Sequence, residues 1–180
     1  MKVIWTDAVA WVAIVVVALL LALATPRSTG VLGRLPVEVG LGLDQRQEMV
    51  GALDGRVLAV VTFHKDQRAV AEGWVQGLGL HKNPSLPWLR MPVLNDPKDE
   101  AERAAAQERL LARYQAEHER AKLMPVFTDR AAFVRAAGAA GVHEVIVLVV
   151  NRNGEVLARV VGSFDENKAS IVRDTLLMDL

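Results

Sequence analysis

The stretch VLAVVTFHKDQRAVAEGW, Val57–Trp74, decides the fold of this chain. Its first part is apolar almost throughout, which is typical of a strand covered on both faces of a sheet. The chain then turns through polar residues into a helix, where Val70, Trp74 and Leu78 recur on one face. A second apolar run, Trp88–Leu94, completes a predicted β-α-β unit with a right-handed crossover.

The middle of the chain predicts a long surface helix from about Pro97 to residue 123. Pro97 suits a first helical turn, and the acidic residues that follow lie at the positive end of the helix dipole. Its apolar stripe is thin, formed by Ala104, Leu111 and Tyr114 with His118 in line. We expect this helix to lie on the surface, with a docking element as the alternative.

The C-terminal part predicts a helix, a β-hairpin and a final helix. A short strand at 124–127 leads to Asp129, which caps the first helix. The β-prone run EVIVLVV (144–150) predicts a central strand, and NRNG (151–154) a turn that returns the next strand antiparallel, with Arg159 nearer the sheet edge. Asp165 caps the last helix, whose core-facing residues are Ala169, Val172 and Leu176.

The N-terminal residues 8–26 carry no charge and are long enough to cross most of a bilayer as a helix. We expect a retained transmembrane anchor at 1–26, with Trp5 and Trp11 near the interface, followed by a linker at 27–42 and a domain at 43–180 that opens with a short helix. A cleaved signal peptide is the alternative, and a buried core helix is a third. The expected location is the cell membrane of a bacterial envelope, with the domain outside the cytoplasm.

Composition excludes several functions. The 180 residues contain no cysteine, so thiol catalysis, disulfides and zinc–thiolate sites are ruled out. The twenty-one basic residues equal the twenty-one acidic ones, and this balance argues against nucleic acid as a partner.

The order of these elements resembles the thioredoxin fold over Val57–Leu180. The resemblance implies an α/β domain with a central mixed sheet, built from a β-α-β and a β-β-α part and flanked by helices. In that family the turn after the first strand holds two cysteines. The corresponding positions here lie near Arg68 and Ala71, and the segment GVHEVIV (141–147) lacks the proline that precedes the family's hairpin. The resemblance therefore carries over the fold and not the redox activity.

A narrower resemblance is to the cysteine-poor thioredoxin-like proteins typified by the mitochondrial ATP synthase assembly factor. Periplasmic peroxiredoxin-like and cytochrome-maturation proteins share the same skeleton. The matching positions are Phe63, Trp74, Thr128, Asp129, Phe133, Gly154 and Gly162. This resemblance implies a role in holding or assembling other proteins.

The turn His64-Lys65-Asp66-Gln67-Arg68 is the candidate partner-binding site. Free N–H groups at the helix start, with Lys65 and Arg68, could receive an anion or a partner's carboxylate. The alternative is a solvated turn in which Asp66 caps the helix. We expect no catalytic residues, no metal and no cofactor, because the four histidines lie far apart in the sequence and no serine stands in a nucleophile elbow.

These observations favour a membrane-anchored binding or assembly module. Its expected partners are a membrane protein or a subunit of a membrane complex, and the lipid bilayer through residues 8–26. There are two alternatives. One is a peroxiredoxin- or reductase-derived enzyme with non-thiol chemistry at the same turn, which would require a low-pKa His64. The other is a purely structural subunit of a membrane complex.

Overall fold

The computed structural model describes residues 30–36, 39, 55–83, 86–114 and 116–178. The chain divides into two units, Met1–Gly30 and Val31–Leu180, and every element described below belongs to the second. The transmembrane anchor expected at 8–26 and the helix expected at 43–55 fall outside the described residues, apart from Gly55 at the end of that helix. Within those described ranges, no helix has both the length and the apolar character that a bilayer span requires.

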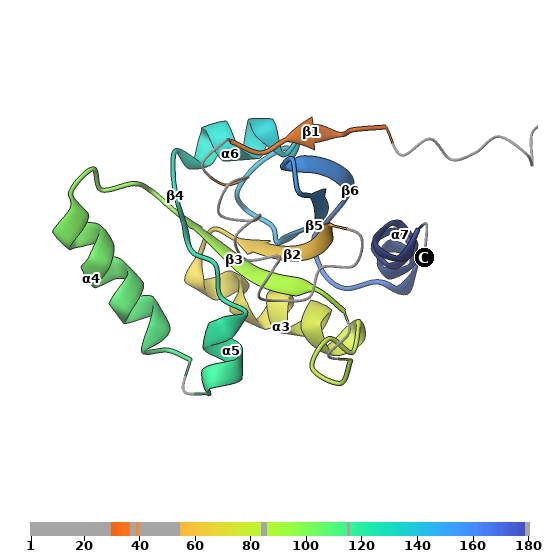
Figure 1. Ribbon diagram of the computed structural model, residues 1–180, viewed down its shortest axis with the longest axis horizontal. Helices are drawn as coiled ribbons and strands as arrows, with labels where there is room; N and C mark the ends of the chain where they lie inside the picture. Colours follow the sequence, from red (N-terminus) through yellow and green to blue (C-terminus); the bar gives the residue numbers. More distant parts are fainter. Residues whose placement is uncertain (1–29, 37–38, 40–54, 84–85, 115, 179–180) are drawn as a thin grey trace, which may run out of the picture. The chain divides into compact units, whose positions relative to one another are not determined.

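A six-stranded mixed sheet forms the centre of the domain (Figure 1). Its strand order is β1-β6-β5-β2-β3-β4. The two strands of the β-α-β unit, β2 and β3, therefore lie between the C-terminal β5–β6 hairpin and the edge strand β4. The strands are β1 (Gly33–Arg34), β2 (Arg56–Thr62), β3 (Trp88–Leu94), β4 (Val126–Phe127), β5 (Ile146–Asn151) and β6 (Glu155–Val161).

The predicted β-α-β unit is confirmed. Strands β2 and β3 are parallel, with Leu58 opposite Trp88 and Thr62 opposite Pro92. They are joined through the short 3₁₀ helix η1 (Lys65–Gln67) and α3 (Arg68–Gly77). Strand β2 is buried on both faces because β3 and β5 flank it and helices cover the sheet. This burial explains why its sequence is apolar without alternation.

The C-terminal part also follows the sequence prediction. Strands β5 and β6 form an antiparallel hairpin closed by Asn151, whose side-chain oxygen accepts from the Asn153 and Glu155 amides. Asp129 caps α6 (Arg130–Ala136), and Asp165 caps α7 (Glu166–Leu177), each by accepting two backbone N–H groups. The three residues expected to face the core from the last helix are all buried.

Two apolar layers hold the sheet between its helices. On one face, Phe133 and Val134 of α6 pack with residues of β2, β3 and β5. On the other face, Trp74 of α3 and Val172 of α7 pack with the alternate residues of the same strands. The indole N–H of Trp74 donates to the Gly162 carbonyl at 2.8 Å and so links α3 to the end of β6. This mixed sheet flanked by helices is consistent with the thioredoxin-like fold.

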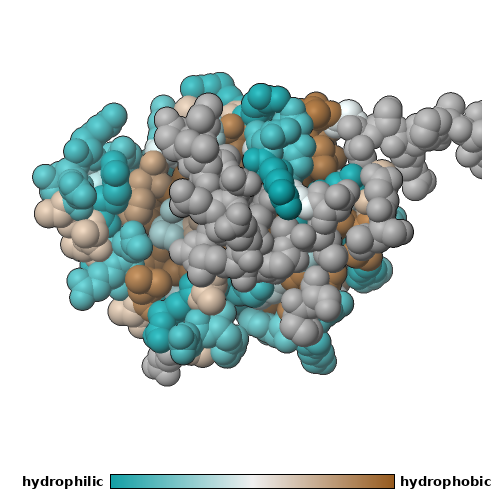
Figure 2. All heavy atoms as spheres, in the orientation of Figure 1, coloured by the Kyte–Doolittle hydropathy of each residue, from teal (hydrophilic) through white to brown (hydrophobic). Residues whose placement is uncertain are grey.

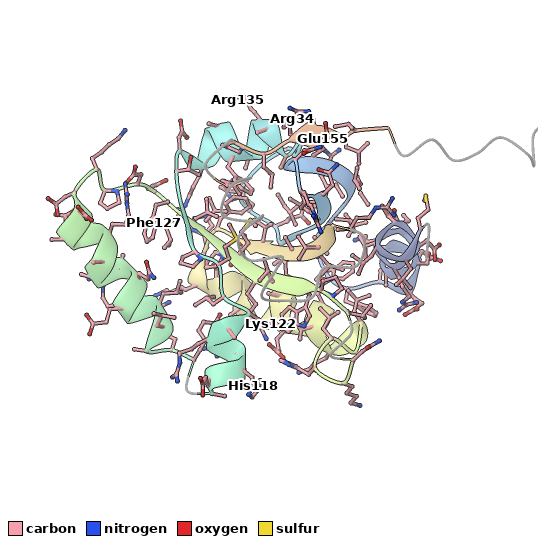
Figure 3. The ribbon with its side chains drawn as sticks, viewed as in Figure 1. Arg34, His118, Lys122, Phe127, Arg135 and Glu155 are labelled. Atoms are coloured by element: carbon pink, nitrogen blue, oxygen red, sulfur yellow. The ribbon has the colours of Figure 1, made fainter. Side chains whose placement is uncertain are left out.

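Part of the segment predicted as a linker, 27–42, belongs to the domain. Gly33 and Arg34 form edge strand β1, antiparallel to β6, and Arg34 is ion-paired with Glu155 (Figure 3). Leu35 and Val39 are buried in the core. The Gly, Pro and Ser content suggested a linker, but pairing with an available sheet edge overrides local composition.

The long helix predicted after Pro97 is interrupted. It consists of α4 (Glu100–Leu111) and α5 (Glu117–Ala121), with Ala116 in an extended conformation between them. No residue described in either helix is buried, so the surface location is confirmed. A helix with little apolar surface receives little stabilisation from packing, and the break lets the following segment reach β3, where Leu123 is buried.

Candidate functional site

The turn after β2 is held by the side chain of Gln67. Its oxygen accepts from the backbone N–H of Phe63 at 2.7 Å and of His64 at 3.2 Å, and its amide donates to the Val142 carbonyl at 2.8 Å. Gln67 is only 6% exposed. It therefore ties the end of β2 to the segment that enters β5.

The five candidate residues of this turn divide by exposure. His64, Lys65, Asp66 and Arg68 are exposed, whereas Gln67 is buried. The capping role of Asp66, the alternative interpretation of this turn, is not observed: Gln67 makes the side-chain contact with the N-cap residue His64 of η1, and α3 has no side-chain cap. The turn is instead ordered by Gln67, which leaves the charged residues at the surface.

A cleft of about 370 Å³ opens beside this turn. Its size lies at the lower end of the range for small-ligand pockets. The turn contributes His64, Lys65 and Arg68, and Ala71 of α3 also lines the cleft. The remaining lining residues come from four other parts of the chain, namely the end of β2, β3, the end of α4 and the start of α6: Val60, Thr62, Phe63, Arg90, Pro92, Val93, Leu94, Leu110, Arg113, Tyr114 and Arg130.

Arg90 of β3 is the buried charge of the cleft. The strand backbone positions it, since its N–H donates to the Lys122 carbonyl at 2.7 Å and its carbonyl accepts from the Met124 N–H at 2.8 Å. Its guanidinium donates to the Glu72 carboxylate at 2.8 Å. Partial burial would raise the pKa of Glu72, but the hydrogen bond and charge of Arg90 outweigh it and lower that pKa below its ordinary value.

The end of α4 and the residues that follow it line the cleft through Leu110, Arg113 and Tyr114. Near the start of α4, Arg103 pairs with Asp96 at 2.8 Å and lies over the Phe127 ring at 5.9 Å. Figure 3 shows Phe127 on β4, on the side toward α4. After the end of α4, the Tyr114 ring lies 5.3 Å from the Arg68 guanidinium. Figure 2 shows hydrophilic side chains over α4 and hydrophobic ones beside it, toward the sheet.

Two of the histidines lie together although the sequence separates them. The rings of His81 and His118 are 6.4 Å apart, and His81 Nε2 is 3.6 Å from the Glu72 carboxylate. Figure 3 shows His118 on α5, with Lys122 at the end of that helix. Burial lowers the pKa of the Lys122 ammonium. The searched, described part of the chain contains no group of three His, Cys, Asp or Glu residues placed to hold a metal ion.

Sequence reasoning found the turn but missed most of the cleft. Arg90 stands in an apolar strand, where a single arginine suggests an exposed edge position, and Arg130 follows a helix cap. The sequence pattern places Tyr114 on the apolar stripe of one continuous surface helix and does not indicate that it lines a cleft. The one usable signal was Arg90 itself, because a charge inside a buried strand requires a partner.

No protein-family model matches the sequence, and no curated protein matches it. Among solved structures, the chain is similar to BsSco, a member of the Sco family of cytochrome c oxidase assembly proteins. The two share 14% identity, with 72% of this chain and 85% of that chain covered and a TM-score of 0.45.

Two further solved structures are similar. One is a putative electron transfer protein from Aquifex aeolicus VF5, at 13% identity over 71% of this chain and 83% of that chain, with a TM-score of 0.45. The other is a thiol:disulfide interchange protein of the thioredoxin family from Chlorobium tepidum TLS, at 15% identity over 70% and 83%, with a TM-score of 0.36. In this chain β2 and β3 are parallel and β5 and β6 form an antiparallel hairpin, which agrees with the mixed sheet predicted from the sequence.

Proposed function

We propose that this chain is a membrane-anchored, redox-inactive thioredoxin-like domain that acts as a protein-binding or complex-assembly module. The observation that supports the proposal best is the cleft at the turn after β2, where exposed His64, Lys65 and Arg68 border a cavity. A membrane protein, or a subunit of a membrane complex, occupies this surface.

Binding rather than thiol chemistry follows from the residues at the turn. The 180 residues contain no cysteine, so the positions near Arg68 and Ala71 cannot exchange electrons with a disulfide. The same positions present a cation and a small side chain to an open cleft. Such a surface can bind a partner protein through electrostatic attraction and complementary shape.

The apolar residues 8–26 anchor the domain in the lipid bilayer in this proposal, with the domain outside the cytoplasm. Tethering confines the domain near membrane proteins and raises its effective concentration for them. The observation that supports the membrane anchor is the uncharged run of nineteen residues, 8–26.

The test is affinity capture from detergent-solubilised membranes of the source organism, with the full 180-residue chain as bait. The wild type is compared with the double variant Arg68→Gln/Arg113→Gln, which removes two exposed cleft charges, and with Arg135→Gln as the matched control. Arg135 is exposed on α6 and does not line the cleft (Figure 3).

We expect a protein identified by mass spectrometry to bind wild type and Arg135→Gln, to be lost from the double variant, and to rebind when purified. Equal recovery with all three baits would show that the cleft does not hold the partner. That result would favour the structural-subunit alternative.

A further inference from the structure

The cleft has an unbalanced charge although the whole chain is neutral. Five of its described lining residues carry a positive charge, and none of those lining residues is acidic. The cations are Lys65, Arg68, Arg90, Arg113 and Arg130. One carboxylate outside the lining, Glu72, neutralises Arg90 and leaves an excess of about four positive charges.

Arg90 is buried and incompletely satisfied. Its side chain is 7% exposed and donates from one terminal nitrogen to Glu72. Its Nε–H is buried and has no hydrogen-bond partner among the described residues. A buried donor without an acceptor is unfavourable. Arg90, which lines the cleft, therefore keeps one donor unsatisfied within the described part of the chain although it is paired with Glu72.

Two exposed arginines of the cleft, Arg68 and Arg113, are not neutralised by any residue that the structure describes, and one of them is held against an aromatic ring. The Arg68 guanidinium lies over the Tyr114 ring, and the Arg90 guanidinium lies 5.9 Å from the centre of the same ring. Within the described ranges, neither Arg68 nor Arg113 forms an ion pair. A guanidinium stacked on an aromatic face keeps its N–H edge available for a planar, two-oxygen acceptor.

Arg130, a half-buried lining residue, adds a charge that is fixed in place. Its Nε donates to the Val93 carbonyl of β3 at 3.0 Å, which holds the guanidinium against the sheet. The walls between the charges are apolar and include Phe63, Leu94 and Leu110. A volume of about 370 Å³ admits one or two side chains, and it excludes a nucleic-acid duplex.

We infer that this cleft is a receptor for carboxylate side chains on a segment of the partner protein, with an adjacent apolar or aromatic side chain packed against its walls. Arg90 and Arg130 receive the inserted carboxylate, and Arg68 and Arg113 contact it or a second one. This inference rests on the proposed function and names the chemistry of its partner.

The experiment uses the full chain in detergent and fluorescence anisotropy. The probe is a fluorescein-labelled five-residue peptide, blocked at both ends, with two glutamates on either side of one phenylalanine. A second probe carries glutamines in place of the glutamates. We expect the glutamate peptide to bind at least about tenfold more tightly, because hydrogen bonds between two charged partners are the stronger kind. Its affinity should fall as salt is raised.

The variants decide whether this binding occurs in the cleft. Arg68→Gln/Arg113→Gln should weaken glutamate-peptide binding about tenfold or more, and Arg135→Gln should leave it unchanged. Arg90→Lys keeps the positive charge but loses the planar guanidinium that can donate two hydrogen bonds to one carboxylate, so it should also weaken binding. A circular dichroism spectrum that matches the wild type would show that this variant is folded. The double variant alters only exposed side chains and decides the matter if Arg90→Lys does not fold.

Three results would overturn the inference: equal binding of both peptides, wild-type affinity in the double variant, or displacement of the glutamate peptide by equimolar inorganic phosphate. The last would identify a site for free anions. If partner capture depends on the cleft arginines while both peptides bind alike, the binding module stands and carboxylate recognition is wrong. If the peptide results hold and capture is insensitive to the variants, the module is wrong and the carboxylate site stands.

Discussion

Replacing Gln67 with alanine removes the side chain that holds the candidate site in shape. Three hydrogen bonds are lost: two from the Phe63 and His64 amides to the side-chain oxygen, and one from the side-chain amide to the Val142 carbonyl. The first is buried, and the other two are partly buried. The turn and the segment that enters β5 then lose their direct side-chain connection.

The size of the effect follows from this difference in burial. The Phe63 amide becomes a buried donor without an acceptor, which costs about 1 to 3 kcal/mol. Each partly buried group can bond water instead, so its loss is closer to about 0.5 to 1.5 kcal/mol. The loss of the three hydrogen bonds together should lower the free energy of unfolding by about 2 to 6 kcal/mol. That is a large part of the roughly 5 to 15 kcal/mol that stabilises a typical domain.

The assay is urea unfolding of the full chain, followed by circular dichroism. The matched control is Gln107→Ala, which truncates an exposed glutamine of α4 with no hydrogen bond among the described side chains. Alanine is the better helix former, so this control should change stability by less than about 0.5 kcal/mol. Hydrogen exchange provides a local reading, because the Phe63 amide in Gln67→Ala should lose its protection.

A Gln67→Ala variant as stable as Gln107→Ala would refute this reasoning. So would an unchanged exchange rate at the Phe63 amide. Either result would mean that the packing of α3, and not the Gln67 side chain, orders the turn.

Three further predictions concern other contacts. Partial burial acts to raise the pKa of Glu72, but the hydrogen bond and charge of Arg90 outweigh that effect, so the pKa is lowered in the folded protein. The Glu72–Arg90 pair therefore stabilises the fold fully above the unfolded-state pKa of Glu72. That stabilisation is lost as the pH falls through the folded-state pKa. Urea midpoints between about pH 3 and pH 6 should therefore fall less steeply in Glu72→Gln than in wild type, and equal slopes would contradict the pairing. Trp74→Phe leaves the buried Gly162 carbonyl without its donor, so thermal unfolding should show a loss of about 1 to 3 kcal/mol; no loss would mean that the indole bond contributes nothing. Asp165→Ala removes the cap of α7 and should lower stability by about 1 kcal/mol in urea, with Asp165→Ser retaining most of it; equal losses in both would argue against capping.

The local elements were predictable because their signals are local. An apolar run flanked by turns predicted β2 and β3, the Asn151–Gly154 turn predicted the hairpin, and the Asp129 and Asp165 caps marked where helices begin. The exclusion of thiol chemistry also follows directly, since no fold can supply a cysteine that the chain lacks. The resemblance to the thioredoxin fold implied a mixed central sheet flanked by helices, and the order of the strands within that sheet came only from the structure.

The amino-acid sequence by itself determined strands β2 to β6, the capped helices and the absence of a redox pair. Only the tertiary structure decided the cleft, because its walls come from the turn after β2, from Arg90, from the end of α4 and from Arg130, which lie far apart along the chain. The same holds for edge strand β1 and for the break before Ala116, where pairing and packing with distant residues override weak local preferences. The buried role of Gln67 likewise depends on Val142, seventy-five residues away, which brings the turn and the entry to β5 together.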